Sequence, residues 1–146
     1  MKIRLVWVGK TKERFIQEGI EKYLRLLRPF ADVAVSEVRE EKGKDIQRMV
    51  EKEGERILKL RSPYVLLDER GKGYTSAGFA DFLSGHQPSV HFVVGGAYGV
   101  SERVKEAAEG TVALSEMTLT HEMSRLFLVE QLYRAFTIIH KRGYHH

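Results

Sequence analysis

The sequence predicts an α/β fold in which a mostly parallel sheet is flanked by helices. Short apolar segments alternate along the chain with segments whose apolar residues recur at helical spacing. Strands that alternate with helices in this way favour a parallel sheet. The strands predicted at residues 90–94 and 111–114 are each followed by a loop and then a helix. The first loop is rich in glycine and the second in hydroxyl side chains. In open α/β sheets, such strand ends build a ligand pocket.

The first predicted elements are a strand and a helix. Residues 2–9 are apolar almost throughout, as expected for a central strand that is buried on both faces. Thr11 can cap a helix over residues 12–27, in which apolar side chains recur every three or four positions. Pro29 then stops this helix.

The elements that follow repeat the pattern. Residues 32–38 alternate apolar and polar side chains and predict a strand, and a charged turn over residues 39–44 follows. Asp45 caps a second helix with inner-face residues as far as Leu60. Later strands are predicted at residues 64–67, 90–94 and 111–114, and later helices at 76–83, 101–109 and 121–140. No repeat, low-complexity tract or linker divides residues 1–146, so we expect one domain.

Composition narrows the classes of function. The chain has no cysteine, which excludes a disulfide framework, a thiolate nucleophile and a zinc finger. No apolar run approaches the roughly 20 residues that span a bilayer, so we expect a cytoplasmic protein without a membrane partner. The 24 basic residues outnumber the 20 acidic ones, which favours a polyanionic partner such as nucleic acid.

A glycine cluster, Gly95-Gly96-Ala97-Tyr98-Gly99, directly follows the strand at residues 90–94. It matches neither the dinucleotide fingerprint G-x-G-x-x-G nor a phosphate-binding P-loop. One interpretation is a tight turn that needs positive φ. The other is a backbone without side chains against which a ligand can lie.

The loop between the last strand and the last helix alternates polar and apolar residues. Its hydroxyls can cap the helix, which Thr120 alone could do. The alternation also suits a loop with an apolar wall and backbone donors, as expected for a purine site. Nothing in it resembles an activated nucleophile. The residues concerned are Leu114, Ser115, Met117, Thr118 and Leu119.

The last predicted helix is apolar on more than one face. Such a helix is buried on most sides, so we expect one face on the sheet and another against a second copy in a symmetric dimer. The alternative is a fully internal helix. The basic tail at residues 141–146 can pair with phosphate and stack on a base, or it can be a frayed terminus. The six histidines show no convincing metal-site spacing.

Four segments of the chain carry a family resemblance: Phe92-Val-Val-Gly-Gly-Ala-Tyr-Gly-Val100, Leu114-Ser-Glu-Met-Thr-Leu119, Glu130-Gln-Leu-Tyr-Arg-Ala-Phe136 and the pair Tyr144-His145. Together they resemble the bacterial ribosomal large-subunit pseudouridine methyltransferase H family. The match extends to Leu5-Val-Trp-Val-Gly9 and to residues 52–55, so it covers the whole chain. The combination of motifs near the carboxyl terminus is specific, whereas the glycine cluster alone would not be.

The resemblance implies a SPOUT-type α/β fold with a C-terminal trefoil knot that acts as a homodimer and binds S-adenosylmethionine. It implies methylation at N(3) of a pseudouridine of 23S rRNA, on the assembled ribosome. Carried over by position, the cofactor contacts are Leu67, Gly95, Gly96, Leu114, Ser115, Glu116, Met117, Thr118 and Leu119.

The terminal pair Tyr144 and His145 matches the residues that meet the target nucleotide in this family. Arg125, Arg134 and Arg142 are candidates for phosphate contacts. No general base is identified. His121 and Glu122 are weaker candidate site residues, since both can instead cap a helix. Two alternatives stay open: a knotted methyltransferase that acts on another RNA such as tRNA, and a non-catalytic RNA-binding module.

Overall fold

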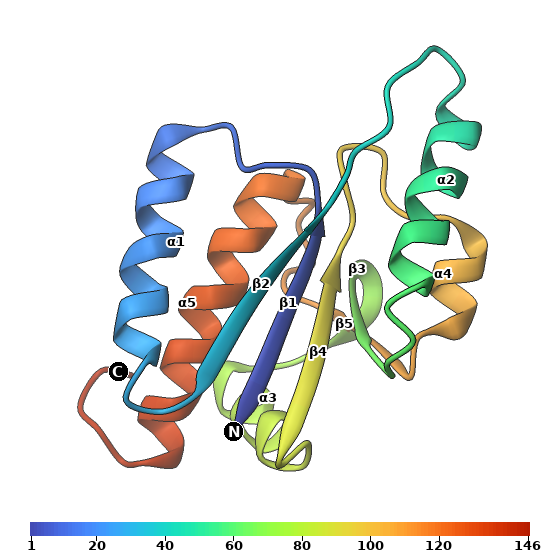
Figure 1. Cartoon of the computed structure of the whole chain (residues 1–146). Helices are drawn as coiled ribbons and strands as arrows, with labels where there is room; N and C mark the ends of the chain where they lie inside the picture. Colours follow the sequence, from blue (N-terminus) through green and yellow to red (C-terminus); the bar gives the residue numbers. More distant parts are fainter.

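The computed structural model describes residues 1–146 and contains five strands and five helices (Figure 1). The strands are β1 (Lys2–Val8), β2 (Asp32–Val38), β3 (Val65–Gly73), β4 (Ser89–Val94) and β5 (Gly110–Ala113). The helices are α1 (Arg14–Leu27), α2 (Ile46–Leu58), α3 (Ser76–Ser84), α4 (Glu102–Ala107) and α5 (His121–Ile139).

The strands form one sheet in the order β2-β1-β4-β3-β5, and every neighbouring pair is parallel. The predicted α/β class with a mostly parallel sheet is therefore confirmed. β1 lies between β2 and β4, where Leu5 pairs with Val35 on one side and Phe92 on the other. This central place explains why β1 is apolar almost throughout.

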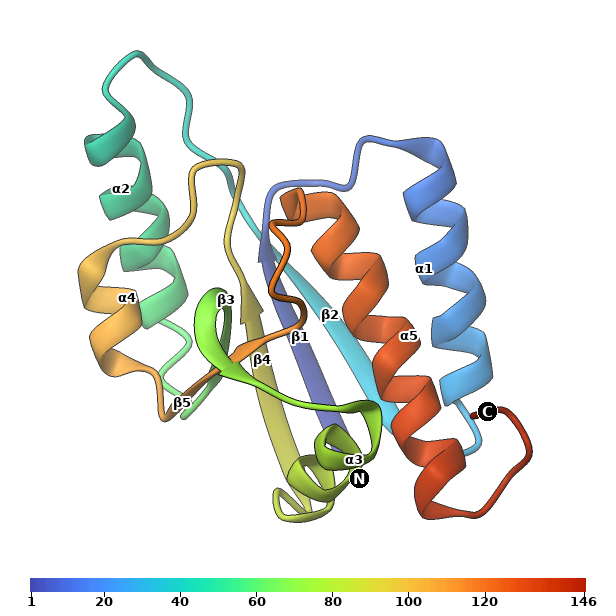
Figure 2. The ribbon, with the colours of Figure 1, turned by 180° about the vertical axis from the view of Figure 1, so that it is seen from behind.

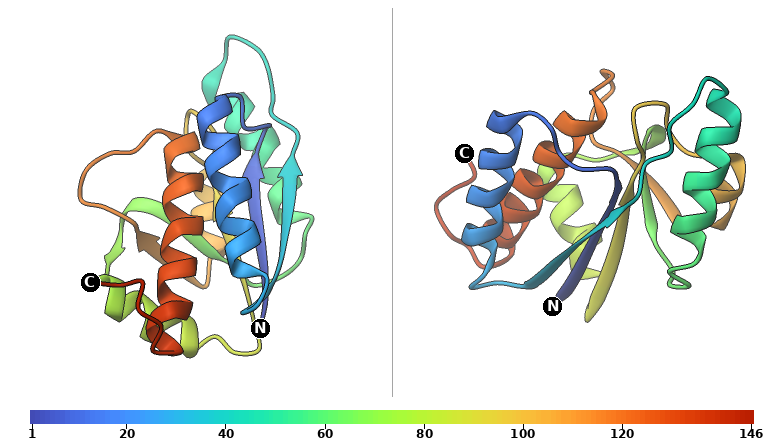
Figure 3. Two further views of the ribbon diagram at one scale, coloured as in Figure 1. Left: turned by 90° about the vertical axis from the view of Figure 1, so that its left-hand side faces the viewer. Right: turned by 45° about the horizontal axis from the view of Figure 1, so that its top comes forward.

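The sheet is the middle of three layers, as the right-hand view of Figure 3 shows. Alternate side chains of β1 point to opposite faces. Leu5 and Trp7 join a core with α1, α3 and α5, whereas Val6 and Val8 join a smaller core with α2 and α4. The two cores fix the helices on both faces, and all five strands then end at one edge of the sheet.

β3 is longer than predicted. It was expected to end at Leu67 but runs to Gly73, with a shift in its register to β5 between Leu67 and Lys72. Gly71 permits this second stretch of pairing, because a Cβ there would lie 2.7 Å from the backbone of Thr111. The apolar pattern stops at Leu67, so no periodicity of side chains indicates that the strand continues.

The predicted cap of α1 is wrong. The helix begins at Arg14 after Glu13, whose side chain makes no cap. The carboxylate of Glu122, 109 residues further along the chain, accepts hydrogen bonds from the backbone N–H of Lys12 at 3.0 Å and of Glu13 at 2.9 Å. Thr11 instead accepts a hydrogen bond from Arg125 at 2.9 Å. A residue from α5 thus replaces the local cap.

α5 finds partners on several sides within its own chain. It packs on the sheet between α1 and α3, as Figure 2 shows for α3 and Figure 1 for α1. Gly19 of α1 allows close contact, since a Cβ there would lie 2.7 Å from Leu126 of α5. Much of the apolar surface that suggested a dimer is therefore buried internally. The homodimer and the trefoil knot stay predictions. None of the helices is long and apolar enough to cross a membrane.

Candidate functional site

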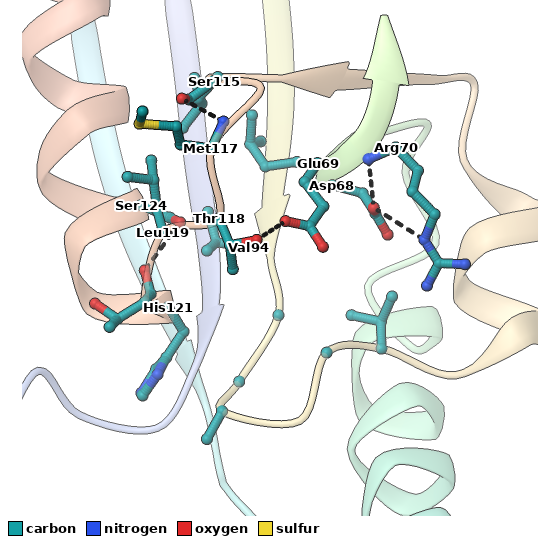
Figure 4. A pocket seen from close by; sticks show the side chains of 18 residues that line it. Asp68, Glu69, Arg70, Val94, Ser115, Met117, Thr118, Leu119, His121 and Ser124 are labelled. Carbon is teal, nitrogen blue, oxygen red and sulfur yellow. Dashed lines mark hydrogen bonds and ion pairs between the residues drawn. The ribbon is translucent and has the colours of Figure 1, made fainter.

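A pocket of about 540 Å³ lies where β3, β4 and β5 end and α5 begins (Figure 4). Its volume falls within the range of small-molecule sites, roughly 300–1,000 Å³. The lining residues are Leu67, Asp68, Glu69, Arg70, Val94, Gly95, Gly96, Ala97, Gly99, Val100, Leu114, Ser115, Met117, Thr118, Leu119, Thr120, His121 and Ser124.

The glycine cluster forms one wall of the pocket. Gly99 adopts φ of 80°, and its N–H donates to the carbonyl of Gly96 at 3.1 Å, which closes a tight turn. A Cβ on Gly95 would lie 2.9 Å from Val100 and 3.0 Å from the carbonyl carbon of Gly99. The tight turn is confirmed by the positive φ of Gly99, whereas contact of Gly95 and Gly96 with a ligand stays a prediction.

The loop after β5 forms the opposite wall. The Ser115 hydroxyl accepts a hydrogen bond from the N–H of Met117 at 2.9 Å, and Thr120 caps α5 by accepting from Met123 at 3.1 Å. Thr118 instead donates to the carboxylate of Glu69 and so joins this loop to the end of β3. Thr120 therefore both caps α5 and lines the pocket, while Ser115 and Thr118 line the pocket and fix the loop.

Most of the predicted cofactor contacts come together here. Leu67, Gly95, Gly96, Leu114, Ser115, Met117, Thr118 and Leu119 all line the pocket. Glu116 does not: it is exposed and lies outside the lining. Contact of these residues with a cofactor stays a prediction.

The sequence did not single out three charged residues of the lining, Asp68, Glu69 and Arg70. They directly follow Leu67, so their position after the apolar stretch of β3 was the available signal. The Asp68 carboxylate accepts from the N–H of Arg70 at 2.9 Å and lies 3.8 Å from its guanidinium. Two carboxylates beside apolar walls give the pocket an environment that suits a ligand with a positive charge.

His121 is the first residue of α5 and lies on the lining beside Ser124. Its Nε2 is 4.0 Å from the carboxylate of Glu122. Burial holds the pKa of the imidazole below its usual value, and the guanidinium of Arg125 adds to this effect. The ring is therefore neutral near pH 7.

The prediction that Arg125 contacts RNA phosphate is wrong. Its side chain is fully buried, and it donates to the carbonyls of Val8 at 2.6 Å and Gly9 at 3.1 Å. The guanidinium carbon also lies 5.2 Å from the centre of the Trp7 ring. Arg125 thus anchors the end of β1 to α5. Arginine side chains are almost never fully buried, so the residue type gave no indication of this position.

The C-terminal candidates form a second group away from the pocket. The Tyr144 hydroxyl donates to Glu130 at 3.0 Å, and Arg134 contacts both Glu130 at 2.6 Å and the ring of His145 at 3.1 Å. Burial, together with hydrogen bonds to Tyr23 and Glu130, raises the pKa of Tyr144. Arg134 is half-buried in this group, whereas Arg142 is exposed.

Within one chain this second group does not reach the pocket. Glu130 lies six residues after Ser124, the last pocket residue on α5, or about 9 Å along the helix at roughly 1.5 Å per residue. Figure 1 shows the carboxyl terminus beside the far ends of α1 and α5, away from the end where α5 begins. Tyr144 and His145 therefore do not contact the pocket of their own chain. They could meet a ligand only in the pocket of a second chain.

The pocket fits an adenosine-containing cofactor. Gly95 and Gly96 leave peptide groups uncovered, and Leu67, Leu114 and Leu119 supply apolar walls for a purine. No group of three histidine, aspartate or glutamate side chains is arranged to hold a metal ion.

Known proteins match this chain over almost its whole length. A family model described as "Predicted SPOUT methyltransferase" matches residues 1–145. A ribosomal RNA large subunit methyltransferase H from Geotalea uraniireducens is 43% identical over 153 residues, covering 100% of both chains. One from Thermodesulfovibrio yellowstonii is 46% identical over 146 residues, covering 99% of each chain.

The fold also resembles a solved structure, a probable methylase family protein from Haemophilus influenzae Rd KW20. The TM-score is 0.59 at 13% sequence identity, and the alignment covers 99% of this chain and 70% of the other. At this identity the likeness concerns the fold alone.

Proposed function

Because this chain belongs to the SPOUT methyltransferase family, we propose that it transfers a methyl group from S-adenosylmethionine to N(3) of a pseudouridine in 23S rRNA of the assembled ribosome. The observation that carries the proposal is the full-length match to ribosomal RNA large subunit methyltransferase H relatives at 40–47% identity. The pocket supports it, since the residues that the family resemblance assigns to the cofactor lie together there.

The residues of the pocket have separate parts in this proposal. Backbone groups of Gly95, Gly96 and the 114–119 loop hold adenosine between apolar walls. Asp68 and Glu69 place negative charge near the cationic sulfonium. When bound, S-adenosylmethionine supplies an electrophilic methyl carbon, so the protein mainly has to orient it toward the base and help remove a proton.

The target RNA is proposed to approach the open side of the pocket. Arg70 lines this pocket with a side chain that is 79% exposed, which makes it suited to pair with phosphate. Arg142 is exposed on the tail. The net charge of +4 supports attraction to a polyanion.

We also propose that the active form is a homodimer with sites built from both chains. Glu130, which accepts the Tyr144 hydrogen bond, lies about 9 Å along α5 from Ser124, the last pocket residue on this helix, and the tail lies at the far end of α5, so we place Tyr144 and His145 at the pocket of a second copy. Exposed apolar side chains of α5, such as Met123 at 36% exposure, support a contact between copies.

The test is label transfer from S-adenosylmethionine carrying a tritiated methyl group. Ribosomes and bulk tRNA, both from a strain that lacks this modification, are incubated separately with the protein. The proposal expects label in the large-subunit rRNA and none in tRNA. Label in tRNA alone would instead favour a different RNA target, and RNA binding without label would favour a non-catalytic module.

A further inference from the structure

We propose that His121 is the catalytic base that receives the N(3) proton of the target pseudouridine. This inference rests on the proposed function and adds a role that the family resemblance left without a secure residue. It is carried by the position of the ring in the pocket, by its free nitrogen, and by the engagement of the other titratable groups there.

The ring is placed where a bound base could meet it. His121 is the first residue after the loop that forms one pocket wall, and it lies on the lining with Thr120 and Ser124. Figure 4 shows the imidazole directed away from Ser115 and Met117, the loop residues at the other end of the pocket. The side chain is 30% exposed, so it is accessible to a ligand while still partly enclosed.

One ring nitrogen is free to accept a proton. Nε2 faces the Glu122 carboxylate at 4.0 Å, and neither ring nitrogen makes a hydrogen bond to protein. Glu122 is itself fixed by the backbone N–H groups of Lys12 and Glu13, at 3.0 and 2.9 Å. A carboxylate on the Nε2 side favours the tautomer with its proton there, which leaves Nδ1 as the acceptor. The same carboxylate stabilises the imidazolium that forms.

The other titratable groups of the pocket are already engaged. Asp68 is paired with Arg70, and Glu69 accepts the hydrogen bond of Thr118. Arg70 is a permanent cation and cannot accept a proton. His121 is therefore the one group of the lining that is basic and makes no hydrogen bond to the protein.

The charges around His121 keep it in the form that the step needs. Burial and the cations Arg125 and Lys12 lower the pKa of the imidazole, while Glu122 and Glu40 act in the opposite direction. The net result is a pKa below the usual value, so the neutral ring predominates at pH 7. A neutral imidazole can act as a general base.

Methyl transfer and proton transfer together conserve atoms and charge. The N(3)–C bond to the methyl group forms with the nitrogen electron pair while the sulfur–methyl bond breaks, and its electrons neutralise the sulfonium. The N(3) proton passes to Nδ1 of His121, which becomes imidazolium. Water removes this proton after the product leaves, so no oxidant or further co-reactant is required.

The test compares wild type with His121→Asn, whose amide oxygen can accept a hydrogen bond near the Nδ1 position but is not basic. His140→Asn, at the exposed end of α5, is the matched control. Single-turnover methyl transfer to ribosomes is measured against pH, and cofactor affinity is measured by calorimetry. An NMR titration of the cofactor-free protein gives the imidazole pKa independently of activity.

We expect the wild-type rate to rise with pH and to level off above a pKa lower than about 6.5. The NMR titration should give the same pKa. His121→Asn should be slower by about 10²- to 10⁴-fold at pH 7, with no levelling and with cofactor affinity within about threefold. Added imidazole should restore part of the rate to His121→Ala.

Three outcomes would overturn the inference alone while wild type still methylates rRNA. They are an unchanged rate and pH profile in His121→Asn, a loss of cofactor affinity that accounts for the lower rate, and an imidazole pKa above 7. If circular dichroism shows that His121→Asn does not fold, the rate of His121→Gln and the NMR titration of wild type test the inference instead. Wild type that methylates no RNA would overturn the proposed function itself, and this inference with it.

Discussion

The guanidinium of Arg125 on α5 donates a hydrogen bond of 2.6 Å to the carbonyl of Val8, the last residue of β1. With Glu122, which binds the backbone just after this strand, Arg125 fastens the β1–α1 connection to the first turns of the helix that borders the pocket. The start of α5 is therefore held by two residues that do not line the pocket. α5 therefore stabilises the fold in addition to lining the pocket.

Replacing Arg125 should reduce stability rather than RNA binding. Arg125→Met leaves the carbonyls of Val8 and Gly9 and the hydroxyl of Thr11 without their donor. We expect a loss of about 2–4 kcal/mol in the free energy of unfolding, measured by urea denaturation. Arg142→Met, an exposed change, should cost less than about 0.5 kcal/mol. Equal stability of the two variants would contradict the buried role of Arg125.

Glu122 should make stability depend on acid pH. Burial alone would raise the pKa of this carboxyl group, but the hydrogen bonds from Glu13 and Lys12 and the charge of Arg125 outweigh it and hold the pKa below its usual value. A carboxyl group with a lowered folded pKa stabilises the fold fully above its unfolded pKa, about 4.3, and this stability is lost as pH falls through the folded pKa.

Glu122→Gln should therefore be less stable than wild type at pH 7, by about 1–3 kcal/mol. The difference should shrink below about pH 4, where the wild-type carboxyl group takes up its proton. Urea midpoints measured from pH 3 to pH 7 check this, with the exposed Glu116→Gln as control. A difference that stays constant across this range would show that the charge of Glu122 is not the cause.

Gly95→Ala should weaken cofactor binding. The new methyl group would lie 2.9 Å from Val100 and 3.0 Å from the Gly99 carbonyl carbon, so the turn that lines the pocket must shift. We expect the dissociation constant for S-adenosylmethionine to rise at least about tenfold by calorimetry. Gly110→Ala places its methyl group in open space and should bind as wild type does. Unchanged affinity of Gly95→Ala would place the cofactor elsewhere.

Mixing two variants with different defects, at a cofactor concentration at which Gly95→Ala alone is inactive, should test whether the site is shared between chains. Gly95→Ala has a damaged pocket and an intact tail, and a chain that ends at Gly143 has an intact pocket but lacks Tyr144 and His145. Random reassociation of the two should recover about a quarter of wild-type methyl transfer, because half of the dimers then contain one complete site. No recovery, despite heterodimers seen by native mass spectrometry, would refute the shared site.

Most strands and helices could be predicted from the sequence because each contributes a regular apolar face to one of the two cores. The parallel sheet buries both faces of β1, so its apolar run and the helical periodicity of α1 and α5 report the fold directly. Pocket residues such as Gly95 and Thr118 were predictable because glycines and hydroxyls stand out directly after apolar strands. The hydrogen-bonded pairs that join α5 to the β1–α1 connection could not be predicted in this way.

Long-range polar contacts account for the errors. The predicted Thr11 cap failed because Glu122, far along the chain, satisfies the same backbone N–H groups, and Arg125 failed as a surface residue because its partners are carbonyls of β1. Backbone carbonyls carry no signal in a sequence pattern. The continuation of β3 to Gly73 depends in the same way on contact with Thr111, which local propensity does not report.

Mass spectrometry of digested 23S rRNA can decide whether this pocket serves methyl transfer to a pseudouridine. Ribosomes from a methylation-deficient strain are incubated with the protein and S-adenosylmethionine whose methyl group is deuterated, and the nuclease fragments are then mapped. We predict that one fragment gains a single deuterated methyl group, located at N(3) of a pseudouridine, and that Gly95→Ala adds far less. A wild-type protein that leaves every fragment of 23S rRNA unlabelled would contradict the proposed function.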